Sequence, residues 1–374
     1  MNFKVSSSAF YSRLTAASKV LASKNSMPIL DCFLMDVRNG NITITASDSE
    51  KYFVTSLPVI EQNGEATFCI PAKTIIDPVK ELVEQPIDIQ FNPETMEVRG
   101  KHNNGTFSVM AQDHAPYPAP KKVSDEATKL TLPAEVLLNG INRCLFATAN
   151  DEIRLVMNGI YVDIQPDSLV FAGTDGRKLV RNTVNSVHAG ISTGFILPKK
   201  VAAILRSVLT KDDGDVNIVF DAEKATISNE DMLMHFRLIE GRYPNYNAVI
   251  PTNNPFVATI DRASLASALK RVAVFCNQSS SLVKLELTPG TLRLTGQDMD
   301  YSTSAEEFIM CEYSNSPISI GFSSLYLLEI VNIIDSESIT LELADPSRPG
   351  IIKPVKENAE DDVLMLLMPM RVDD

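Results

Sequence analysis

The chain of 374 residues repeats one plan three times, and this internal repeat limits its fold more than any single motif does. A strand that ends in an aspartate turn recurs, and the aspartates Asp48, Asp175 and Asp298 lie 127 and 123 residues apart. About 23 residues after each aspartate, an apolar strand runs directly into a helix. A period of this length fits whole domains, not the short units of a solenoid. The sequence therefore predicts three copies of one domain.

Each copy combines strands with two helices. Apolar and polar residues alternate at 42–45, 87–91, 216–220 and 339–343, which predicts strands with one buried face, as in antiparallel sheets backed by helices. Turn residues predict hairpins at Asn39-Gly40, Asn104-Gly105 and Pro289-Gly290. Proline-rich or polar segments separate the copies and place the domains at 1–125, 126–252 and 253–374. The predicted fold is α+β, and the charged segment 356–362 is expected to form a hairpin tip.

The charges are unevenly distributed along the chain. Helices are expected at 8–24, 72–84, 134–148, 199–211, 262–275 and 323–335. These helices carry a net charge of +7, and because the whole chain carries −13, the other residues carry −20. In the helix from Lys199, Val201 and Leu205 fall on one stripe, while Lys199 and Arg206 fall on the opposite face. A basic helix face suits an anionic partner such as nucleic acid, and chance placement of solvated lysines is the alternative.

Few residues indicate catalysis or metal binding. The four histidines form no helical pair, and the five cysteines lack zinc-site spacing. The segment 211–215 starts like a calcium loop but has no glutamate at the twelfth position, and 173–178 lacks the Gly-Lys-Ser/Thr of a phosphate loop. We therefore expect no catalytic residue, metal or cofactor. Separated cysteines in apolar segments, without a membrane span or a secretory signal, are typical of a reduced cytoplasmic protein.

The last apolar segment, 363–371, contains three methionines and Pro369. Proline lacks the donor that a central strand needs, so Pro369 predicts a sheet edge or an exit from the sheet. Methionine adapts its shape to different ligands, which favours a groove for varied peptides, and a core strand is the alternative.

Several motifs resemble one known family. They are Met27-Pro28-Ile29-Leu30, Asn158-Gly159, Thr174-Asp175-Gly176, Gly241-Arg242-Tyr243-Pro244-Asn245-Tyr246 and Met368-Pro369-Met370-Arg371-Val372. With these motifs the chain is similar, along its whole length, to the bacterial sliding clamps, the beta subunits of the replicative DNA polymerase. The resemblance implies three domains of the DNA-clamp fold per chain. It also implies a head-to-tail homodimer that closes a ring of six domains around duplex DNA, with helices lining the hole and no catalysis of its own.

The resemblance also implies three sets of site residues. The candidates for sequence-independent DNA contact are the helix cations and one basic loop position, namely Lys24, Lys73, Lys80, Lys199, Lys200 and Arg206. A groove for the glutamine-plus-hydrophobic motif of the polymerase, the clamp loader and other partners would be formed by Arg154, Met157, Thr174, Gly176, Arg177, Leu179, Pro244, Val249, Leu366, Met368, Pro369, Met370 and Arg371. The dimer contact would pair Phe107 and Val109 with Val274 and Phe275 of the second chain.

Some positions depart from the family pattern. Arg177 stands where histidine is common, Val156 where tyrosine is common, and Ala248 where a basic residue is common, while Asp373 and Asp374 extend the usual terminus. These departures affect the peptide preference of the groove and not its existence. Two other functions stay open at this point: a peptide-binding scaffold that does not encircle DNA, and an enzyme with a site between domains.

Overall fold

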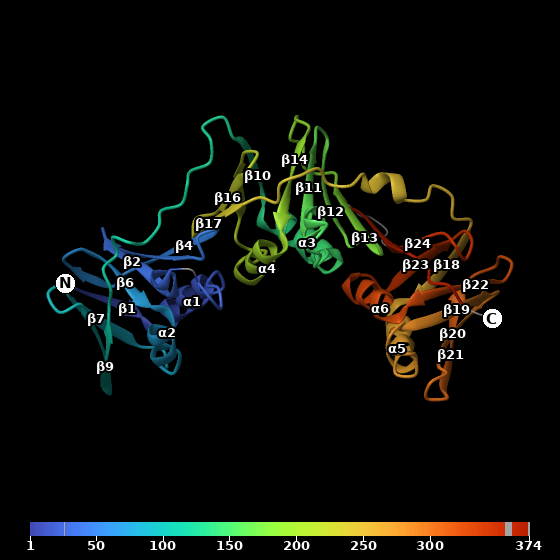
Figure 1. The fold of residues 1–374 in the computed structure, drawn as a ribbon, viewed down its shortest axis with the longest axis horizontal. Coiled ribbons are helices and arrows are strands. Elements are labelled where there is room, and N and C mark those ends of the chain that lie inside the picture. Colours follow the sequence, from blue (N-terminus) through green and yellow to red (C-terminus); the bar gives the residue numbers. More distant parts are fainter. Residues whose placement is uncertain (26, 356–360, 373–374) are drawn as a thin grey trace. The chain divides into compact units, whose positions relative to one another are not determined.

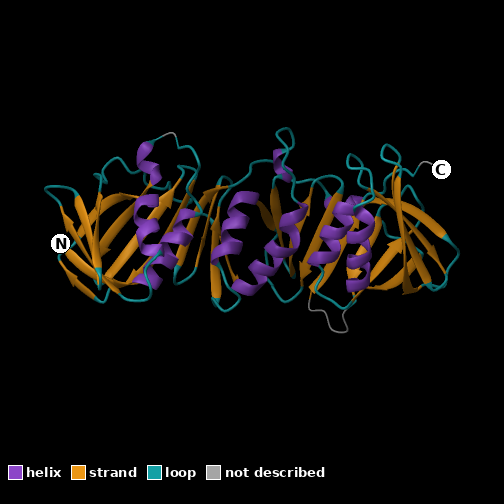
Figure 2. Ribbon diagram, turned by 90° about the horizontal axis from the view of Figure 1, so that it is seen from below, coloured by secondary structure: helices purple, strands orange, loops and turns teal. Residues whose placement is uncertain are grey.

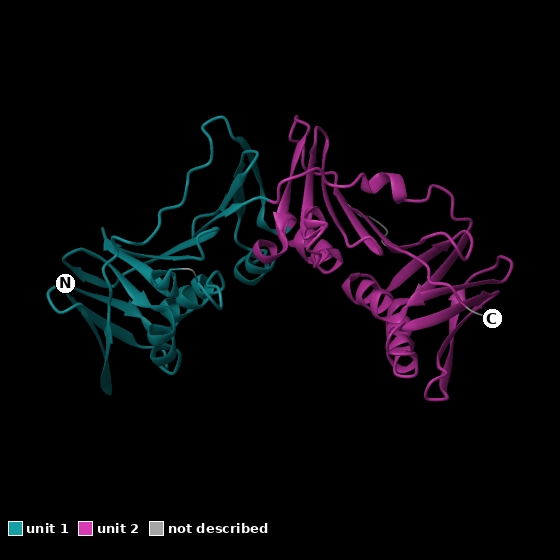
Figure 3. Ribbon diagram, in the orientation of Figure 1, with its two compact units in different colours: residues 1–135, 203–238 teal, residues 136–202, 239–374 magenta. Residues whose placement is uncertain are grey.

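The computed structural model describes the chain except for residues 26, 356–360 and 373–374. By internal packing the chain forms two compact units, residues 1–135 with 203–238 and residues 136–202 with 239–374 (Figure 3). The first unit contains a five-stranded and an eight-stranded sheet, and the second contains a twelve-stranded sheet. The expected hairpin tip at 356–362 lies mostly outside the described residues.

The elements occur in the same order in three consecutive repeats (Figure 1). The first repeat comprises β1 (Asn2–Ser6), α1 (Ser7–Ser18), β2 (Cys32–Arg38), β3 (Asn41–Ser47), β4 (Lys51–Pro58), β5 (Glu61–Asn63), β6 (Ala66–Pro71), α2 (Ala72–Lys80), β7 (Pro86–Asn92), β8 (Glu97–His102) and β9 (Gly105–Met110). The second comprises β10 (Thr128–Pro133), α3 (Ala134–Cys144), β11 (Gly159–Gln165), β12 (Ser168–Thr174), β13 (Lys178–Val184), β14 (Thr193–Pro198), α4 (Lys199–Val208), β15 (Asp215–Phe220), β16 (Lys224–Ser228) and β17 (Met232–Arg237). The third comprises β18 (Phe256–Asp261), α5 (Arg262–Ala273), β19 (Leu282–Thr288), β20 (Thr291–Asp298), β21 (Thr303–Glu312), β22 (Ile318–Ser323), α6 (Ser324–Ile333), β23 (Ser338–Leu343), β24 (Gly350–Pro354) and β25 (Asp361–Leu367).

The pairing of the strands is also the same in the three repeats. Each repeat has one set of four antiparallel strands ordered as in β6-β2-β3-β4 and a second set ordered as in β1-β7-β8-β9. Neighbouring repeats share their sheets, because β4 pairs with β17 and β13 pairs with β25. The expected α+β fold with two helices on antiparallel sheets per repeat is thus confirmed. The boundaries at 125 and 252 stay a prediction, since the middle repeat contributes strands to both units.

The helices begin where the strand-to-helix junctions predict and pack on one side of the strands in each unit (Figure 2). The side chains of Ser6, Asp261 and Ser323 accept backbone N–H groups at the starts of α1, α5 and α6. Buried side chains such as Phe10 and Leu269 hold α1 and α5 on the sheets. Helix α1 also packs on α2, and α5 packs on α6. No helix of the described chain is long and apolar enough to cross a membrane.

The expected helix ends were too late by two to six residues. The apolar periodicity continues past the last helical hydrogen bond, because Val20, Leu145 and Leu209 are buried although they lie beyond α1, α3 and α4. The apolar pattern follows the residues that are buried in the core, and these include residues after the helix. The helix itself ends earlier, because the chain must turn toward the next strand.

Two further expectations need correction. The loop between β8 and β9 is Asn103-Asn104, because Gly105 already pairs with His102. The last apolar strand is also not at a sheet edge: β25 lies between β13 and β24 and ends at Leu367. Its continuous apolar run reflects burial on both faces, and Pro369 marks the exit of the chain from the sheet.

Candidate functional site

The floor of the predicted groove is an apolar cluster where β13 meets β25. Leu179 and Leu366 pair across these strands, and each is only 2% exposed. Tyr243 and Tyr246 pack against them from the segment after β17. The hydroxyl of Tyr243 donates to the carbonyl of Ala172 (3.4 Å), and burial raises the pKa of this phenol. A floor without free polar groups can accept an apolar side chain.

A tight turn forms one rim of the groove. Thr174 accepts the N–H of Gly176 (3.0 Å), and the Asp175 carboxylate accepts the N–H groups of Arg177 and Lys178 (2.8 and 2.9 Å). Gly176 has φ +86°, and a Cβ there would lie 3.0 Å from Nη1 of Arg154. Glycine is therefore required both for the backbone conformation and for the approach of the guanidinium.

The segments that follow Arg154 and Pro244 carry exposed apolar side chains. Leu155 and Val249 are 58% and 56% exposed, on two short 3₁₀ turns, and Met157 and Pro244 are half-buried nearby in sequence. Arg154 binds the Asp151 carboxylate at 2.9 Å. The backbone N–H groups of Arg154 and Ile153, and then the Arg154 side chain, hold the pKa of Asp151 below its usual value.

Beyond β25 the chain forms a second wall. The N–H of Met368 donates to the carbonyl of Arg177 (2.8 Å), and that of Met370 donates to Gly321 (2.8 Å). Arg177, Met368, Pro369 and Met370 line a cavity of about 490 Å³ whose other lining residues are 278–281, Ser323, Leu325 and Tyr326. Arg371 is exposed beside it.

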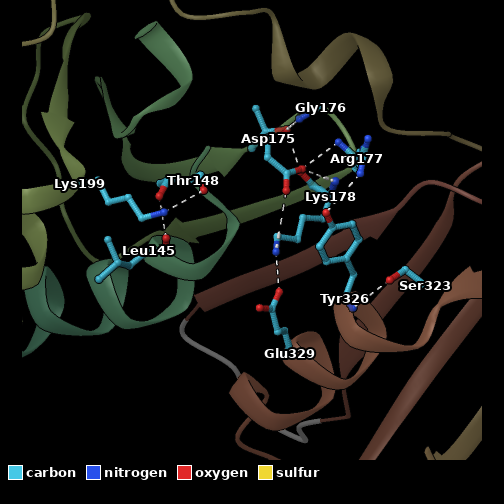
Figure 4. A network of polar contacts seen from close by, with 11 residues as sticks. Leu145, Thr148, Asp175, Gly176, Arg177, Lys178, Lys199, Ser323, Tyr326 and Glu329 are labelled. Atoms are coloured by element: carbon cyan, nitrogen blue, oxygen red, sulfur yellow. Dashed lines mark hydrogen bonds and ion pairs between the residues drawn. The ribbon is translucent and has the colours of Figure 1, made fainter. Parts of the chain in front are cut away.

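A buried lysine fixes one side of this cavity (Figure 4). The Lys178 side chain is 5% exposed, and its Nζ lies 2.5 Å from the Glu329 carboxylate and 4.3 Å from the ring centroid of Tyr326. Nη1 of Arg177 lies 3.5 Å from the Tyr326 hydroxyl. Tyr326 is therefore held at its ring by Lys178 and at its hydroxyl by Arg177.

Four of the expected groove residues line this cavity, namely Arg177, Met368, Pro369 and Met370, and Leu179 and Leu366 lie in the apolar cluster. The cavity also has lining residues that the sequence did not indicate. Ser323, Leu325 and Tyr326 come from the end of β22 and from α6, and 278–281 form a serine-rich loop. No local pattern links α6 to Arg177, because 149 residues separate Tyr326 from it. The sequence of α6 differs from that of a cationic helix such as α4, because its only charged residue is Glu329.

The expected DNA-contacting cations are mostly exposed. Lys24 lies in the loop after α1, Lys73 and Lys80 lie on α2, and Lys200 and Arg206 lie on α4. Only Lys80 of these five has an ion-pair partner among the described residues, Glu81 at 3.8 Å. Lys199 differs, because it is half-buried and donates to the Thr148 carbonyl (3.3 Å). Burial, and then the charge of Lys178, lowers its pKa.

Of the expected dimer residues, Phe107 and Val109 lie on the edge strand β9, and Val274 and Phe275 follow α5. Within the described chain β9 forms its ladder only with β8, and residues 303–310 of β21 form theirs only with β20. Val274 and Phe275, after α5, are 77% and 38% exposed. Phe107 is half-buried and Val109 is 6% exposed, so both already pack inside the first unit. The edge strands β9 and β21 also carry exposed apolar residues that the sequence did not indicate, namely Met110, Phe308 and Met310.

Three repeats of this unit, joined through shared sheets and backed by helices, define the class of DNA-clamp proteins. Family models of the DNA polymerase III beta subunit match the chain three times, with the N-terminal domain at 1–121, the central domain at 131–245 and the C-terminal domain at 247–371. The chain therefore belongs to the DNA polymerase III beta subunit family, the beta sliding clamps, which are accessory subunits without polymerase catalysis.

Relatives match over the full length. The chain is 27% identical to the beta sliding clamp of Chlamydia pneumoniae and 25% identical to that of Pseudomonas putida, and each alignment covers 100% of both chains. It is 28% identical to a sliding clamp of Bartonella birtlesii, solved bound to griselimycin, with a TM-score of 0.91 and full coverage of both chains. A sliding clamp structure from Pseudomonas aeruginosa, 23% identical with full coverage, has a TM-score of 0.93 and shows the shared fold.

Proposed function

We propose that the protein acts as a processivity factor, which closes as a head-to-tail homodimer around duplex DNA and tethers replication proteins through the groove at β13 and β25. The observation that carries this proposal is the pattern of sheet joins. The last strand of one repeat pairs with the fourth strand of the repeat before it, as β17 pairs with β4 and β25 pairs with β13. Among the described strands that hold these two positions, β9 and β21 are left without such a partner.

A second copy of the chain supplies the missing partners. If β21 of one chain pairs with β9 of the other, two such joins continue the pattern between repeats and close a ring of six repeats. Exposed Phe308 and Met310 on β21, and Val274 and Phe275 after α5, supply apolar surface for burial at each join. The edges and the apolar residues thus support the same assembly.

The distribution of charge supports DNA in the centre of this ring. With the observed bounds the six helices still carry +7 in a chain of −13. Exposed lysines and arginines attract phosphate without reading bases, and a small number of contacts keeps the affinity low enough for sliding. A closed ring retains DNA by topology, so tight binding is unnecessary.

The groove supports the tethering role. Its apolar floor, its adaptable methionines and the cation of Arg177 suit a short peptide with hydrophobic and polar residues. By family resemblance the partners are the polymerase catalytic subunit, the clamp loader and other proteins with a clamp-binding motif, and the location is the cytoplasm.

Retention on circular DNA tests the ring. The protein is loaded with a clamp loader onto nicked circular DNA and separated from free protein by gel filtration. We expect retention that is lost after the DNA is linearised, because the ring slides off the ends. Retention that survives linearisation, or peptide binding without any retention, would identify a DNA-binding or scaffold protein instead.

Charge reversal tests the helix cations. Lys73→Glu with Arg206→Glu should lower loading onto DNA by about tenfold or more, since two attractive contacts become repulsive. Lys101→Glu with Lys129→Glu, two exposed strand residues, changes net charge equally and is the matched control. Equal loading of both double variants would exclude a specific role for the helix cations.

A further inference from the structure

The backbone scaffold of the partner groove occurs a second time in the chain, where the first repeat joins the second. Asp48 accepts the N–H groups of Glu50 and Lys51 (3.1 and 2.8 Å), as Asp175 accepts those of Arg177 and Lys178. The two turns therefore match residue by residue, with Glu50 in the place of Arg177.

The strand pairing beside the two turns is also the same. Lys51 pairs with Phe236, as Lys178 pairs with Leu367. One residue further on, the N–H of Arg237 donates to the Glu50 carbonyl (3.3 Å), as Met368 donates to Arg177. Arg237 thus occupies the position that Met368 holds in the groove.

The segments between repeats complete the match. The Tyr117 hydroxyl donates to the Thr45 carbonyl (3.4 Å), as Tyr243 donates to Ala172, and each acceptor lies three residues before its aspartate. A proline follows both tyrosines. The segment around Tyr117, after the first repeat, therefore contacts its sheet in the same way as the segment around Tyr243 at the groove.

The chemistry of the second site is different. In place of the apolar floor of Leu179 and Leu366 it has Tyr52 and His235, which are 5% and 7% exposed. These residues and Arg237 line a cleft of about 350 Å³, within the usual range of about 300–1,000 Å³ for ligand pockets. The linker adds Lys121 and strand β16 adds Lys224, so that the lining contains three cations and two anions, Glu50 and Glu223. Lys224 and Glu223 form an ion pair at 3.9 Å.

We propose that this cleft is a second docking site, which takes a short acidic segment of a protein partner. The repeated scaffold offers an extended peptide the same backbone surroundings as the groove, and the side chains change the selection from apolar to anionic. Lys121, Lys224 and Arg237 supply the positive charge. Tyr52 and Pro118 supply an apolar wall for one aromatic or aliphatic residue.

His235 supplies polarity at the base of the cleft. Its Nδ1 lies 3.0 Å from the Thr226 hydroxyl, which can donate to it and leave Nε2 as the N–H donor of the ring. The Tyr52 ring is tilted beside the imidazole, with centroids 6.2 Å apart. The site therefore offers a neutral donor together with the cations. It does not depend on DNA encirclement or on the apolar groove.

Peptide binding by the full-length protein tests the proposal. The probe is a fluorescein-labelled peptide Glu-Asp-Tyr-Asp-Glu, and its uncharged match is Gln-Asn-Tyr-Asn-Gln, both followed by anisotropy at about 50 and about 300 mM salt. We expect the acidic peptide to bind about tenfold or more tightly than its match at low salt, and less tightly at high salt. Equal affinity for the two peptides would overturn the proposal.

Two variants locate the binding. Lys121→Glu with Arg237→Glu should lower the affinity for the acidic peptide by about tenfold or more, and exposed Lys121→Glu alone should lower it severalfold. Met368→Ala, in the apolar groove, should leave this affinity unchanged. The opposite pattern, with loss in the Met368 variant only, would place the peptide in the groove and refute a second site. A short single-stranded oligonucleotide that displaces the peptide with equal affinity would also refute it.

Discussion

Lys178 is almost fully buried beside the groove. Its contacts show how a single residue contributes to the structure of the groove wall. Its charge is balanced by Glu329 at 2.5 Å and Asp175 at 3.8 Å. The ring centroids of Tyr326 and Phe146 lie 4.3 and 5.4 Å from its Nζ. Burying an ammonium is costly unless such partners are present. Because Tyr326 and Arg177 line the cavity, the ion pair also positions the groove wall.

Replacing this lysine should therefore affect both stability and binding. Lys178→Met leaves the two carboxylates without their cation, and since Glu329 is 48% exposed it regains part of its hydration. We expect the free energy of unfolding in urea to fall by about 1–3 kcal/mol. The affinity for a groove-binding peptide should fall severalfold. Lys353→Met breaks the more exposed pair with Glu342 and is the control, with about 0–1 kcal/mol lost. Equal losses in the two variants would contradict the role of Lys178.

His235 should make stability depend on pH. Burial, and then the charge of Lys224, holds the pKa of folded His235 below the usual histidine value of about 6.5. As the pH falls through about 6.5, the unfolded chain takes up a proton that the folded protein does not, so the free energy of unfolding decreases until the lower folded pKa is reached. The wild type should therefore lose more thermal stability between about pH 7.5 and 5.5 than His235→Gln does. Identical losses would show that His235 does not contribute.

At the level of secondary-structure elements, the sequence predicted the first residues of the helices better than their last residues. Helix starts follow from strand-to-helix junctions at fixed spacing, and the first residues of α2, α3, α4 and α5 agree with the expectation. Helix ends were missed because Val20 and Leu209 continue the apolar pattern outside the helix. The apolar run of β25 showed burial, but its two neighbours β13 and β24 are set by tertiary pairing, which no local pattern encodes.

The candidate site was predictable to a similar extent. Leu179 and Leu366 lie in strands with a strong apolar pattern, and the family resemblance includes them among the groove residues. Tyr326 was missed, because only the folded chain brings α6 beside the turn at Arg177. The repeated scaffold at Tyr117 and Tyr243 is visible in the sequence only as two Tyr-Pro pairs, and hydrogen bonds were needed to show the match.

The edge strand β9 depends on one glycine in β8. Gly100 pairs with Phe107, and a Cβ at Gly100 would lie 2.1 Å from the Phe107 ring. Gly100→Ala should push the ring away from the sheet and lower the free energy of unfolding by about 1–3 kcal/mol. On the proposed dimer, the same variant should raise the dissociation constant about tenfold, measured by sedimentation. Thr106→Ala, at an exposed position of β9, is the control. A Gly100 variant as stable and as dimeric as this control would show that the ring moves without disturbing β9.

At the scale of the whole molecule, the three repeats explain why the chain does not satisfy its own pairing pattern. In each join, the last strand of one repeat pairs with the fourth strand of the repeat before it. Three repeats make two such joins, so the last strand of the first repeat, β9, and the fourth strand of the third repeat, β21, lack this partner among the described residues. Open edges invite association with other chains unless they are protected. In the proposed closed dimer β9 and β21 pair with each other, whereas a monomer exposes Phe308 and Met310.

Charging the β21 edge should thus open the assembly without damaging the repeats. Phe308 and Met310 are 62% and 78% exposed, so their replacement by aspartate leaves the core of the second unit intact. Burial of such a side chain contributes about 1.5–3 kcal/mol, and the double variant should raise the dimer dissociation constant by about two to four orders of magnitude. Retention on nicked circular DNA should be lost with the dimer, while the affinity for a groove peptide stays within about twofold, because β13 and β25 are unchanged. Ile191→Asp, in an exposed loop, is the control and should stay dimeric. A double variant that remains dimeric at the same protein concentration would place the dimer contact elsewhere than β21.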